Sequence, residues 1–355
     1  MKKILQIASA FIGIIVGAGF ASGQEILQYF TSFGYKGTIG AIIATILFAY
    51  LGMILTRLGS RAQTTSHREV IYFISGRKIG VIVDYIIVFT LFGVGVVMIA
   101  GAGSILNQQF SLPSFVGITL MTIIVMLTVM LDVHRVVSII ASIAPFLILT
   151  VMVISMYSLF TVDTPLREME FIATDQPSAV SHWLLSAINY VSFNIALGAS
   201  MALVMGGAEK NKRTATIGGL LGGLGIGILI VFNHYAIFSN ISMVAEYEMP
   251  ILKIADDISP VFGIIYSIIL FGMIFNTAVS MFFSLGSRFM PNGTPAFRRF
   301  SIITILAAFA LSFVGFTKLV SLFYPIIGYL GFFLIIVLII APFRMKAWKA
   351  EKNSY

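Results

Sequence analysis

Residues 17–25 read Gly17-Ala18-Gly19-Phe20-Ala21-Ser22-Gly23-Gln24-Glu25, and they interrupt an apolar stretch that runs from Ile4 to Phe30. Three glycines weaken a helix at a depth where lipid offers no water to the freed backbone groups, and a carboxylate follows at once. Irregular backbone inside a bilayer is tolerated only where protein encloses it or where it lines a cavity. Interrupted spans whose half-helix ends face substrate and ion are typical of secondary transporters. The sequence therefore predicts a transporter whose site lies at this break.

The composition is that of an integral membrane protein. Hydrophobic residues make up 59% of the chain, charged residues make up 10%, and the mean hydropathy is +1.02. A helix needs about 20 apolar residues to cross a hydrocarbon core of about 30 Å. We expect an all-α membrane protein that forms a single domain over residues 1–355, without a cleaved signal peptide. Ten transmembrane helices are expected at residues 4–31, 37–57, 79–107, 113–131, 136–160, 181–207, 214–238, 259–288, 299–316 and 319–342.

The net charge of +8 reflects membrane topology rather than nucleic-acid binding. With a cytoplasmic N-terminus, all but four of the 22 Lys and Arg residues fall on the inner side; the exceptions are Lys36, Arg167, Lys253 and Lys318. This asymmetry follows the positive-inside rule. We therefore expect a multi-pass protein of a bacterial plasma membrane with both termini in the cytoplasm. Its expected partners are the lipid bilayer and a small-molecule substrate, and no nucleic acid.

Ten spans divide into two halves of five, residues 1–160 and 161–355, and the odd number inverts the second half in the membrane. Span 6 corresponds to span 1, and the polar and small residues in its middle, Asn194 and Gly198, predict a second broken span. The alternative is that these two residues serve helix packing. Residues 246–258, after span 7, are expected to form a short helix on the outer surface, a candidate lid.

Glu25 is one of the two carboxylates placed inside the spans. A charge at the bilayer centre costs roughly 2.5–3.5 kcal/mol on insertion scales, so such a group is usually paired, neutralised or in contact with water. One role for Glu25 is a capping box, because Ser22 to Glu25 has the S-x-x-E form. The other role is a substrate or proton site. An ionised Glu25 would compete with a substrate carboxylate and favour an ammonium group or a quaternary amine. The cation–π faces would come from Phe20, Tyr29, Tyr190 and Phe193.

Asp84 is the second carboxylate. It is expected to form an ion pair at the inner end of span 3, with Arg135 or the N-terminal lysines, or else to act as an inner gate that breaks during transport. The four histidines lie in loops or near helix ends and form no ligand-spaced pair, and the chain has no cysteine. With no H-E-x-x-H motif and no serine–histidine or aspartate pair at mid-depth, we expect no enzyme.

The motif Val16 to Ile26, in the first of ten spans, resembles the YkvI family of bacterial membrane proteins. That family is grouped with the amino acid–polyamine–organocation superfamily and the LeuT fold. The loop motif Arg68 to Tyr72 and the chain length extend the resemblance along the whole sequence. The resemblance implies two inverted five-helix repeats around a central site.

The wider superfamily also implies a sodium site. Gly13 to Gly19 is similar to the stretch of span 1 that lends two carbonyls to sodium in sodium-coupled members, and the matching positions are Gly13 and Val16. The partners from span 8 would be Asn276 and Thr277, or Thr277 and Ser280, whose oxygen atoms suit a hard cation. Some proton-coupled members place a lysine of span 5 where sodium would sit, and span 5 here has none, which leaves Na⁺ open. Na⁺ is thus the expected coupling ion, with H⁺ as the alternative, and no covalent cofactor is expected.

These observations together predict a secondary active transporter that imports a small amino acid or an organic amine, including quaternary ammonium solutes. Coupling to Na⁺ or H⁺ would act through alternating access, with spans 1 and 6 rocking against spans 3, 4, 8 and 9. A gating or proton-coupling role is open for Glu25 and Asp84. The alternative function is a ligand sensor that uses a transporter fold without transporting. The expected substrate contacts are Gly19, Phe20, Ala21, Ser22, Gly23, Glu25, Tyr190, Phe193 and Asn194.

Overall fold

The computed structural model describes residues 1–63, 77–130, 144–161 and 165–352, and within these ranges the chain is helical without a strand. Seven described helices are long and apolar enough to cross a membrane. Two shorter apolar helices cover Ser114–Met130 and Pro145–Ser158, and the first apolar stretch is divided into shorter pieces. The all-α membrane fold is confirmed, whereas the count of ten spans and the inverted repeats stay predictions. The motif Arg68 to Tyr72 and Arg135 lie outside the described residues.

The first span is broken where the sequence predicts it. It consists of α1 (Lys2–Ile15), α2 (Ala18–Ser22) and α3 (Gln24–Tyr29). At the first break, the Val16 N–H still donates to Ile12 O at 2.7 Å, but the Gly17 N–H donates to Ile15 O at 2.9 Å instead of to the carbonyl four residues back. Gly17 is extended, with φ −99° and ψ −169°. The helical hydrogen-bond pattern is therefore lost over a few residues in the middle of the span.

A second break lies at Gly23. This residue has φ +85° and ψ −12°, a left-handed conformation that favours glycine. It also faces a tight contact, because a Cβ atom at this position would lie 2.8 Å from Ile251 Cγ1 and 3.1 Å from Ile237 Cδ1. Both the backbone angle and the available space require a residue without a side chain here.

The rest of the described chain is also mainly helical. After the turn η1 (Thr31–Phe33), the elements are α4 (Gly34–Ala62), α6 (Arg77–Phe110), α7 (Ser114–Met130), α9 (Ala144–Thr161), α10 (Leu166–Thr174), α11 (Trp183–Gly207), α12 (Lys212–Ser239), α13 (Ile241–Val244), α14 (Pro250–Ile258), α15 (Pro260–Phe289), α16 (Pro295–Ser312) and α17 (Phe316–Lys352).

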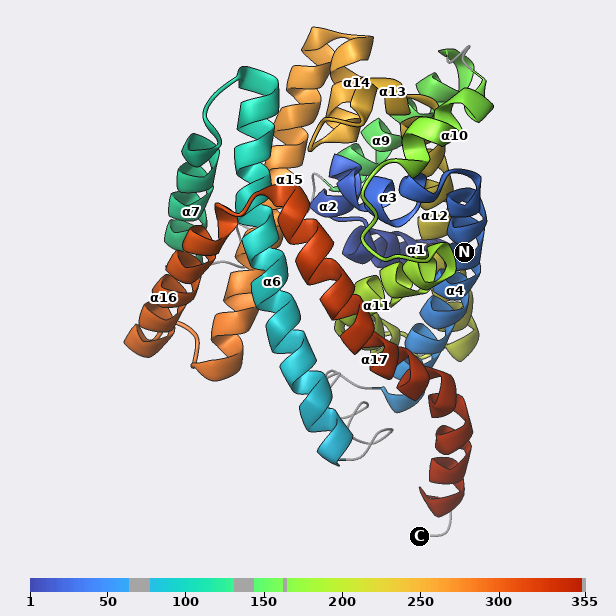
Figure 1. Ribbon diagram of the computed structural model, residues 1–355. Coiled ribbons are helices and arrows are strands. Elements are labelled where there is room, and N and C mark those ends of the chain that lie inside the picture. The colour runs from blue at the N-terminus through green and yellow to red at the C-terminus, as the bar shows by residue number, and fades with distance from the viewer. Residues whose placement is uncertain (64–76, 131–143, 162–164, 353–355) are drawn as a thin grey trace.

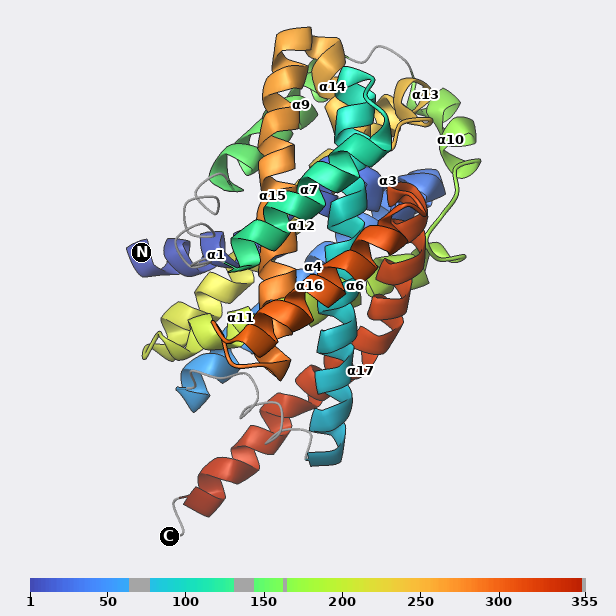
Figure 2. The same cartoon turned by 90° about the vertical axis from the view of Figure 1, so that its left-hand side faces the viewer.

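These helices form two packed bodies. The bundle consists of α1, α4, α11 and α12, and the scaffold consists of α6, α7, α15 and α16. Figure 1 shows the bundle on the right and the scaffold on the left, and in Figure 2 the scaffold faces the viewer. Helix α17 contacts both α11 and α6, while α9 contacts both α12 and α15. The half-helix α2 packs against α15, so the broken span lies where the two bodies meet.

The predicted break in span 6 is wrong, because α11 is continuous from Trp183 to Gly207. The Asn194 side chain donates to the carbonyl of Tyr190 at 3.0 Å, which satisfies this polar group along its own helix. Gly198 allows α1 to pack closely against α11, since a Cβ atom there would lie 2.6 Å from Ile15 Cδ1. The small and polar residues of span 6 thus serve helix packing, which was the alternative interpretation.

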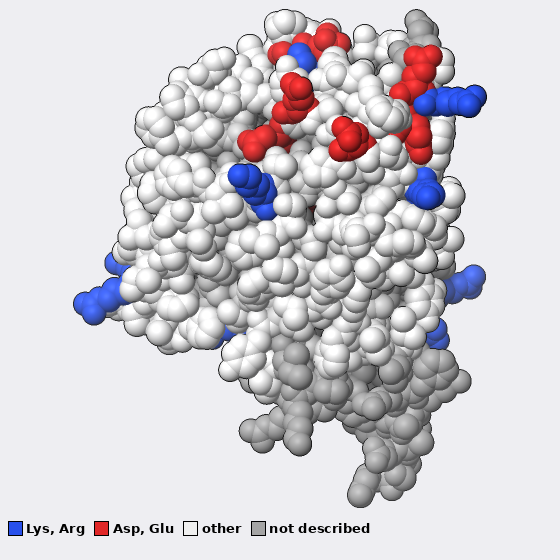
Figure 3. All heavy atoms as spheres, in the orientation of Figure 1, with Lys and Arg blue, Asp and Glu red and all other residues white. Residues whose placement is uncertain are grey.

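The short helix expected after span 7 is present as α14, with Ile251, Leu252, Ile254 and Ala255 buried, and its place on the outer surface stays a prediction. The loop before it is tied to α6 of the scaffold. The Met249 N–H donates to Gln108 Oε1 at 3.0 Å, and Gln108 Nε2 donates to Met249 O at 3.0 Å. On the face shown in Figure 3, acidic residues gather at the end where α10 and α14 lie. This loop and helix cover the second break of the first span.

Candidate substrate site at the broken span

Glu25 lies in the first turn of α3, and its side chain is 5% exposed. Its Oε2 atom accepts a hydrogen bond from the Tyr190 hydroxyl of α11 at 3.2 Å. Its Oε1 atom lies directly against the backbone of Gly19, where a Cβ atom would overlap it. The Tyr324 hydroxyl of α17 lies 3.2 Å from the same Cβ position. The carboxylate is therefore folded back over α2 and is enclosed by α11 and α17.

The capping box predicted for Glu25 is wrong. The Ser22 hydroxyl donates to Gly19 O at 2.6 Å and accepts the Gln24 N–H at 3.1 Å, and α3 has no side-chain cap. The reason is the left-handed Gly23, which makes Gly23 itself the N-cap. Glu25 is then the second residue of α3, one position short of the place that a capping box requires. Its carboxylate is consequently free to face the site.

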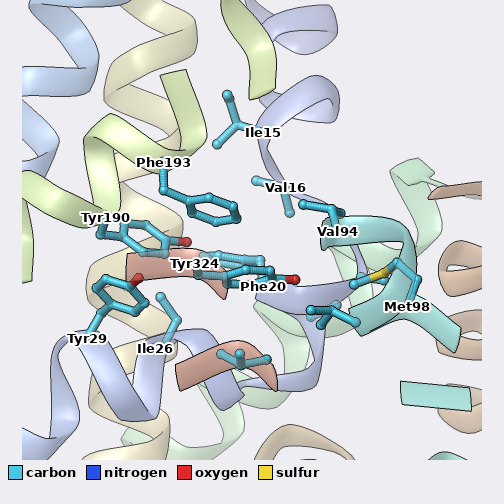
Figure 4. Close-up of a cluster of buried hydrophobic side chains, with 14 of the residues drawn as sticks. Ile15, Val16, Phe20, Ile26, Tyr29, Val94, Met98, Tyr190, Phe193 and Tyr324 are labelled. Carbon is cyan, nitrogen blue, oxygen red and sulfur yellow. The ribbon is translucent and has the colours of Figure 1, made fainter. Parts of the chain in front are cut away.

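Five aromatic side chains lie around the part of the broken span that carries the Glu25 carboxylate. Figure 4 shows Phe20, Tyr29, Tyr190, Phe193 and Tyr324 close together, contributed by α2, α3, α11 and α17. The centroids of the Tyr29 and Tyr190 rings are 5.2 Å apart, and Phe193 stacks on Tyr324 at 4.2 Å with an interplanar angle of 19°. The structure thus brings the predicted Phe20, Tyr29, Tyr190 and Phe193 together. Tyr324 had no sequence signal beyond a hydroxyl in an apolar span.

The predicted residues of α2 and its C-cap, Gly19, Phe20, Ala21, Ser22 and Gly23, are all buried. Two side chains that the sequence did not point to hold the end of this half-helix. Asn233 Nδ2 of α12 donates to Phe20 O at 3.2 Å, and the Tyr266 hydroxyl of α15 donates to Ala21 O at 2.6 Å. One donor comes from the bundle and the other from the scaffold, so α2 is held by both bodies.

The predicted sodium ligands fall into two groups. Val16 O and Gly13 O have lost their helical donors at the break, because the described backbone hydrogen bonds include none from Phe20 to Val16 or from Gly17 to Gly13. On α15, Asn276 Oδ1 is buried without a hydrogen-bond partner among the described residues. Free oxygen atoms of this kind fit a hard cation. No described hydrogen bond joins the two groups, and the sodium site, with Thr277 and Ser280, stays a prediction.

Asp84 forms the ion pair that the sequence predicts, but with a different partner. Arg288 Nη2 of α15 lies 2.6 Å from Asp84 Oδ1 of α6, so this pair lies within the scaffold. Lys3 pairs instead with Glu209 at 3.4 Å, on the bundle side. Neither of the described ion pairs includes Glu25. Asp84 lies apart from the Glu25 site, and its gating role stays a prediction.

His234, one of the four histidines placed in loops or near helix ends, is buried. It lies in α12 with 1% of its surface exposed. Its Nδ1 lies 3.0 Å from the Thr31 hydroxyl, and its Nε2 lies 2.9 Å from the Thr38 hydroxyl. The described residues contain no cluster of His, Asp and Glu that could hold a metal ion. His234 therefore joins the end of the first span to α4 in a structural role.

The chain has two curated relatives of almost equal length. It is 27% identical over 335 residues to the uncharacterized membrane protein YkvI of Bacillus subtilis, covering 92% of each chain. It is 28% identical over 343 residues to the uncharacterized protein YyaD of the same organism, covering 95% of this chain and 96% of YyaD. No protein-family model matches the chain.

Solved membrane transporters share the fold. MhsT in complex with L-phenylalanine has a TM-score of 0.61 at 17% identity, and the match covers 92% of this chain and 87% of the MhsT chain. Mhp1 in its inward-facing conformation has a TM-score of 0.58 at 14% identity, and the match covers 92% of this chain and 73% of the Mhp1 chain. A manganese transporter of Eremococcus coleocola has a TM-score of 0.57 at 14% identity, with 87% and 70% covered.

The broken first span between bundle and scaffold, together with these structures, defines the class: the chain is a membrane protein with the LeuT fold. The similarity to YkvI and YyaD confirms the resemblance to the YkvI family.

Proposed function

We propose that this protein is a secondary active transporter, not an enzyme, that imports a small amino acid or an organic amine, including quaternary ammonium solutes, by alternating access. The observation that carries this proposal is the buried carboxylate of Glu25 at a break in the first span, where bundle and scaffold meet. Burying an unpaired carboxylate is costly, so its retention at this place argues for a functional group. The LeuT fold shared with solved transporters supports the same conclusion.

The packing supports movement of the bundle against the scaffold. α2 is the element through which the first span contacts α15, and its C-terminal carbonyls are held by Asn233 and Tyr266 from opposite bodies. Rocking of the bundle would break the bond to Tyr266 and open a path to Glu25. Substrate bound at Glu25 and the backbone of α2 would then face one side of the membrane at a time.

Na⁺ is the coupling ion that we propose, held by the carbonyls of Gly13 and Val16 with Asn276, Thr277 and Ser280 of α15. A bound cation would stabilise the C-terminal end of α1, where the helix dipole is negative. H⁺ carried by Glu25 is the alternative. A Na⁺ ion between α1 and α15 would join bundle and scaffold, and would thereby link ion binding to the closed arrangement of the site.

The test is uptake by the purified protein in proteoliposomes, driven by an inward Na⁺ gradient, a proton gradient or neither. Candidate radiolabelled solutes are small amino acids, choline and short alkylamines. We expect concentrative uptake of one class that depends on one gradient and is lost in Glu25→Gln. Glu168→Gln, at an exposed position of α10, is the matched control. Binding of a ligand without any gradient-driven flux would refute transport and favour the ligand sensor.

A further inference from the structure

We infer that the substrate of the Glu25 site is a protonated primary or secondary amine without a carboxylate group. This inference rests on the proposed function, because it assigns the chemistry of the solute that the transporter carries. It selects one class from the amino acids, amines and quaternary ammonium solutes considered above.

The charge of the site selects a cation. Glu25 presents a carboxylate, and neither described ion pair supplies it with a lysine or arginine. An amino acid would bring its own carboxylate close to Glu25, and no described basic side chain forms a hydrogen bond or ion pair there to hold it. Like charges in a poorly solvated site repel strongly, whereas a net cation neutralises the buried carboxylate. The substrate that completes this site is therefore positively charged overall.

The hydrogen-bonding groups select an N–H donor. Oε2 of Glu25 already accepts from the Tyr190 hydroxyl, while the described hydrogen bonds include none to Oε1 or to the Tyr324 hydroxyl. Both of these oxygen atoms lie next to the same point, the Cβ position of Gly19. An ammonium group with at least two N–H bonds can donate to both at once. A quaternary ammonium group has no N–H bond and can donate to neither oxygen atom.

The aromatic rings suit the rest of such a solute. Tyr190, Phe193 and Tyr324 are fully buried, with Tyr190 and Phe193 at 6.4 Å and Phe193 stacked on Tyr324. Their faces attract a cation and pack against an alkyl or aryl group. The aromatic rings beside the Glu25 carboxylate thus suit an amine, whose ammonium group contacts the carboxylate and whose apolar part packs against the rings.

The test compares each amino acid with the amine that lacks its carboxylate. The pairs are alanine with ethylamine, valine with isobutylamine and phenylalanine with phenethylamine, and tetramethylammonium and choline are the quaternary probes. Binding to the detergent-purified protein is measured by titration of its thermal unfolding, with and without Na⁺. We expect at least one amine to bind about ten-fold or more tightly than its amino acid and than both quaternary probes.

Two variants tie this preference to the site. Glu25→Gln should weaken amine binding about ten-fold or more and remove the preference over the amino acid. Tyr324→Phe should weaken the binding of primary amines and leave the weak binding of the quaternary probes unchanged. Tyr329→Phe, whose ring is 46% exposed on the same helix, is the matched control and should bind as the native protein does.

Three results would overturn the inference: amino acids binding as tightly as their amines, quaternary probes binding as tightly as primary amines, or no amine binding at all. The proposed function is judged separately, by gradient-driven flux of whichever solute binds. Concentrative uptake of an amino acid would refute the amine assignment and leave the transporter standing. An amine that binds tightly but is never carried across the membrane would refute the transporter and leave the assignment standing.

Discussion

At the scale of single residues, Gly19 determines where the carboxylate of Glu25 lies. The hydrogen atom of a glycine leaves the space that Oε1 occupies, and any Cβ atom would overlap it. The position of a buried charge is thus set by the absence of a side chain on the neighbouring half-helix. Gly17, two residues earlier, has no atom within 4 Å of its Cβ position and an extended backbone that alanine adopts.

Gly19→Ala should therefore displace the carboxylate and weaken binding of the site's ligand about ten-fold or more. Gly17→Ala should bind as the native protein does, which makes the two variants a matched pair at one break. Ligand titrations followed by thermal unfolding measure both. Equal binding by Gly19→Ala and the native protein would show that Glu25 does not contact the ligand.

At the scale of elements, the broken first span and the continuous helix α11 show which structural features could be predicted from the sequence. The break in the first span was predicted, because three glycines beside a carboxylate have no packing explanation in lipid. Asn194 and Gly198 of α11 fit either a break or a packed helix, and only the contact with α1 decides between them. Tyr266, Asn233 and Tyr324 could not be predicted from the sequence, since their roles depend on which helices become neighbours.

The packing role of Gly198 predicts that Gly198→Leu destabilises the protein. A leucine would push α1 from α11, because the Cβ position already lies 2.6 Å from Ile15 Cδ1. Such overpacking costs about 1–3 kcal/mol, seen as a lower unfolding temperature. Met201→Leu, at a position that is 60% exposed on the same helix, should be neutral. A flexible break at Gly198 would predict the opposite result, with leucine strengthening the helix.

The bond from Tyr266 to Ala21 predicts a local effect on α2. Tyr266→Phe removes a 2.6 Å hydrogen bond and leaves the Ala21 carbonyl without this donor. We expect faster deuterium uptake over residues 17–23 and a loss of about 1 kcal/mol of stability. Tyr329→Phe serves again as the exposed control. Unchanged exchange over these residues would mean that the scaffold does not hold the half-helix.

At the scale of the whole molecule, the loop before α14 is hydrogen-bonded to α6 of the scaffold. Gln108 of α6 makes two hydrogen bonds to the backbone of Met249, and Ser104 of α6 donates to the Glu248 carboxylate, so this loop is held to the scaffold. The chain contains no cysteine, which gives a clean background for cross-linking.

Cross-linking a pair of cysteines introduced at Gln108 and Met249 should therefore hold the loop permanently to α6. We expect ion-driven uptake to fall by about ten-fold or more after treatment with a short thiol cross-linker. Each single-cysteine variant, treated in the same way, is the control. Full uptake by the cross-linked double variant would show that this contact persists throughout the transport cycle.

The placement of the ion pairs has a consequence for the energy of transport. Asp84 and Arg288 both belong to the scaffold, and Lys3 and Glu209 both lie on the bundle side. The hydrogen bonds from Tyr266, Gln108 and Ser104 that join the moving parts all have uncharged donors. Among the described residues, rocking therefore separates neither of these two ion pairs, so impermeant salt that screens surface charge should not change the turnover rate through them.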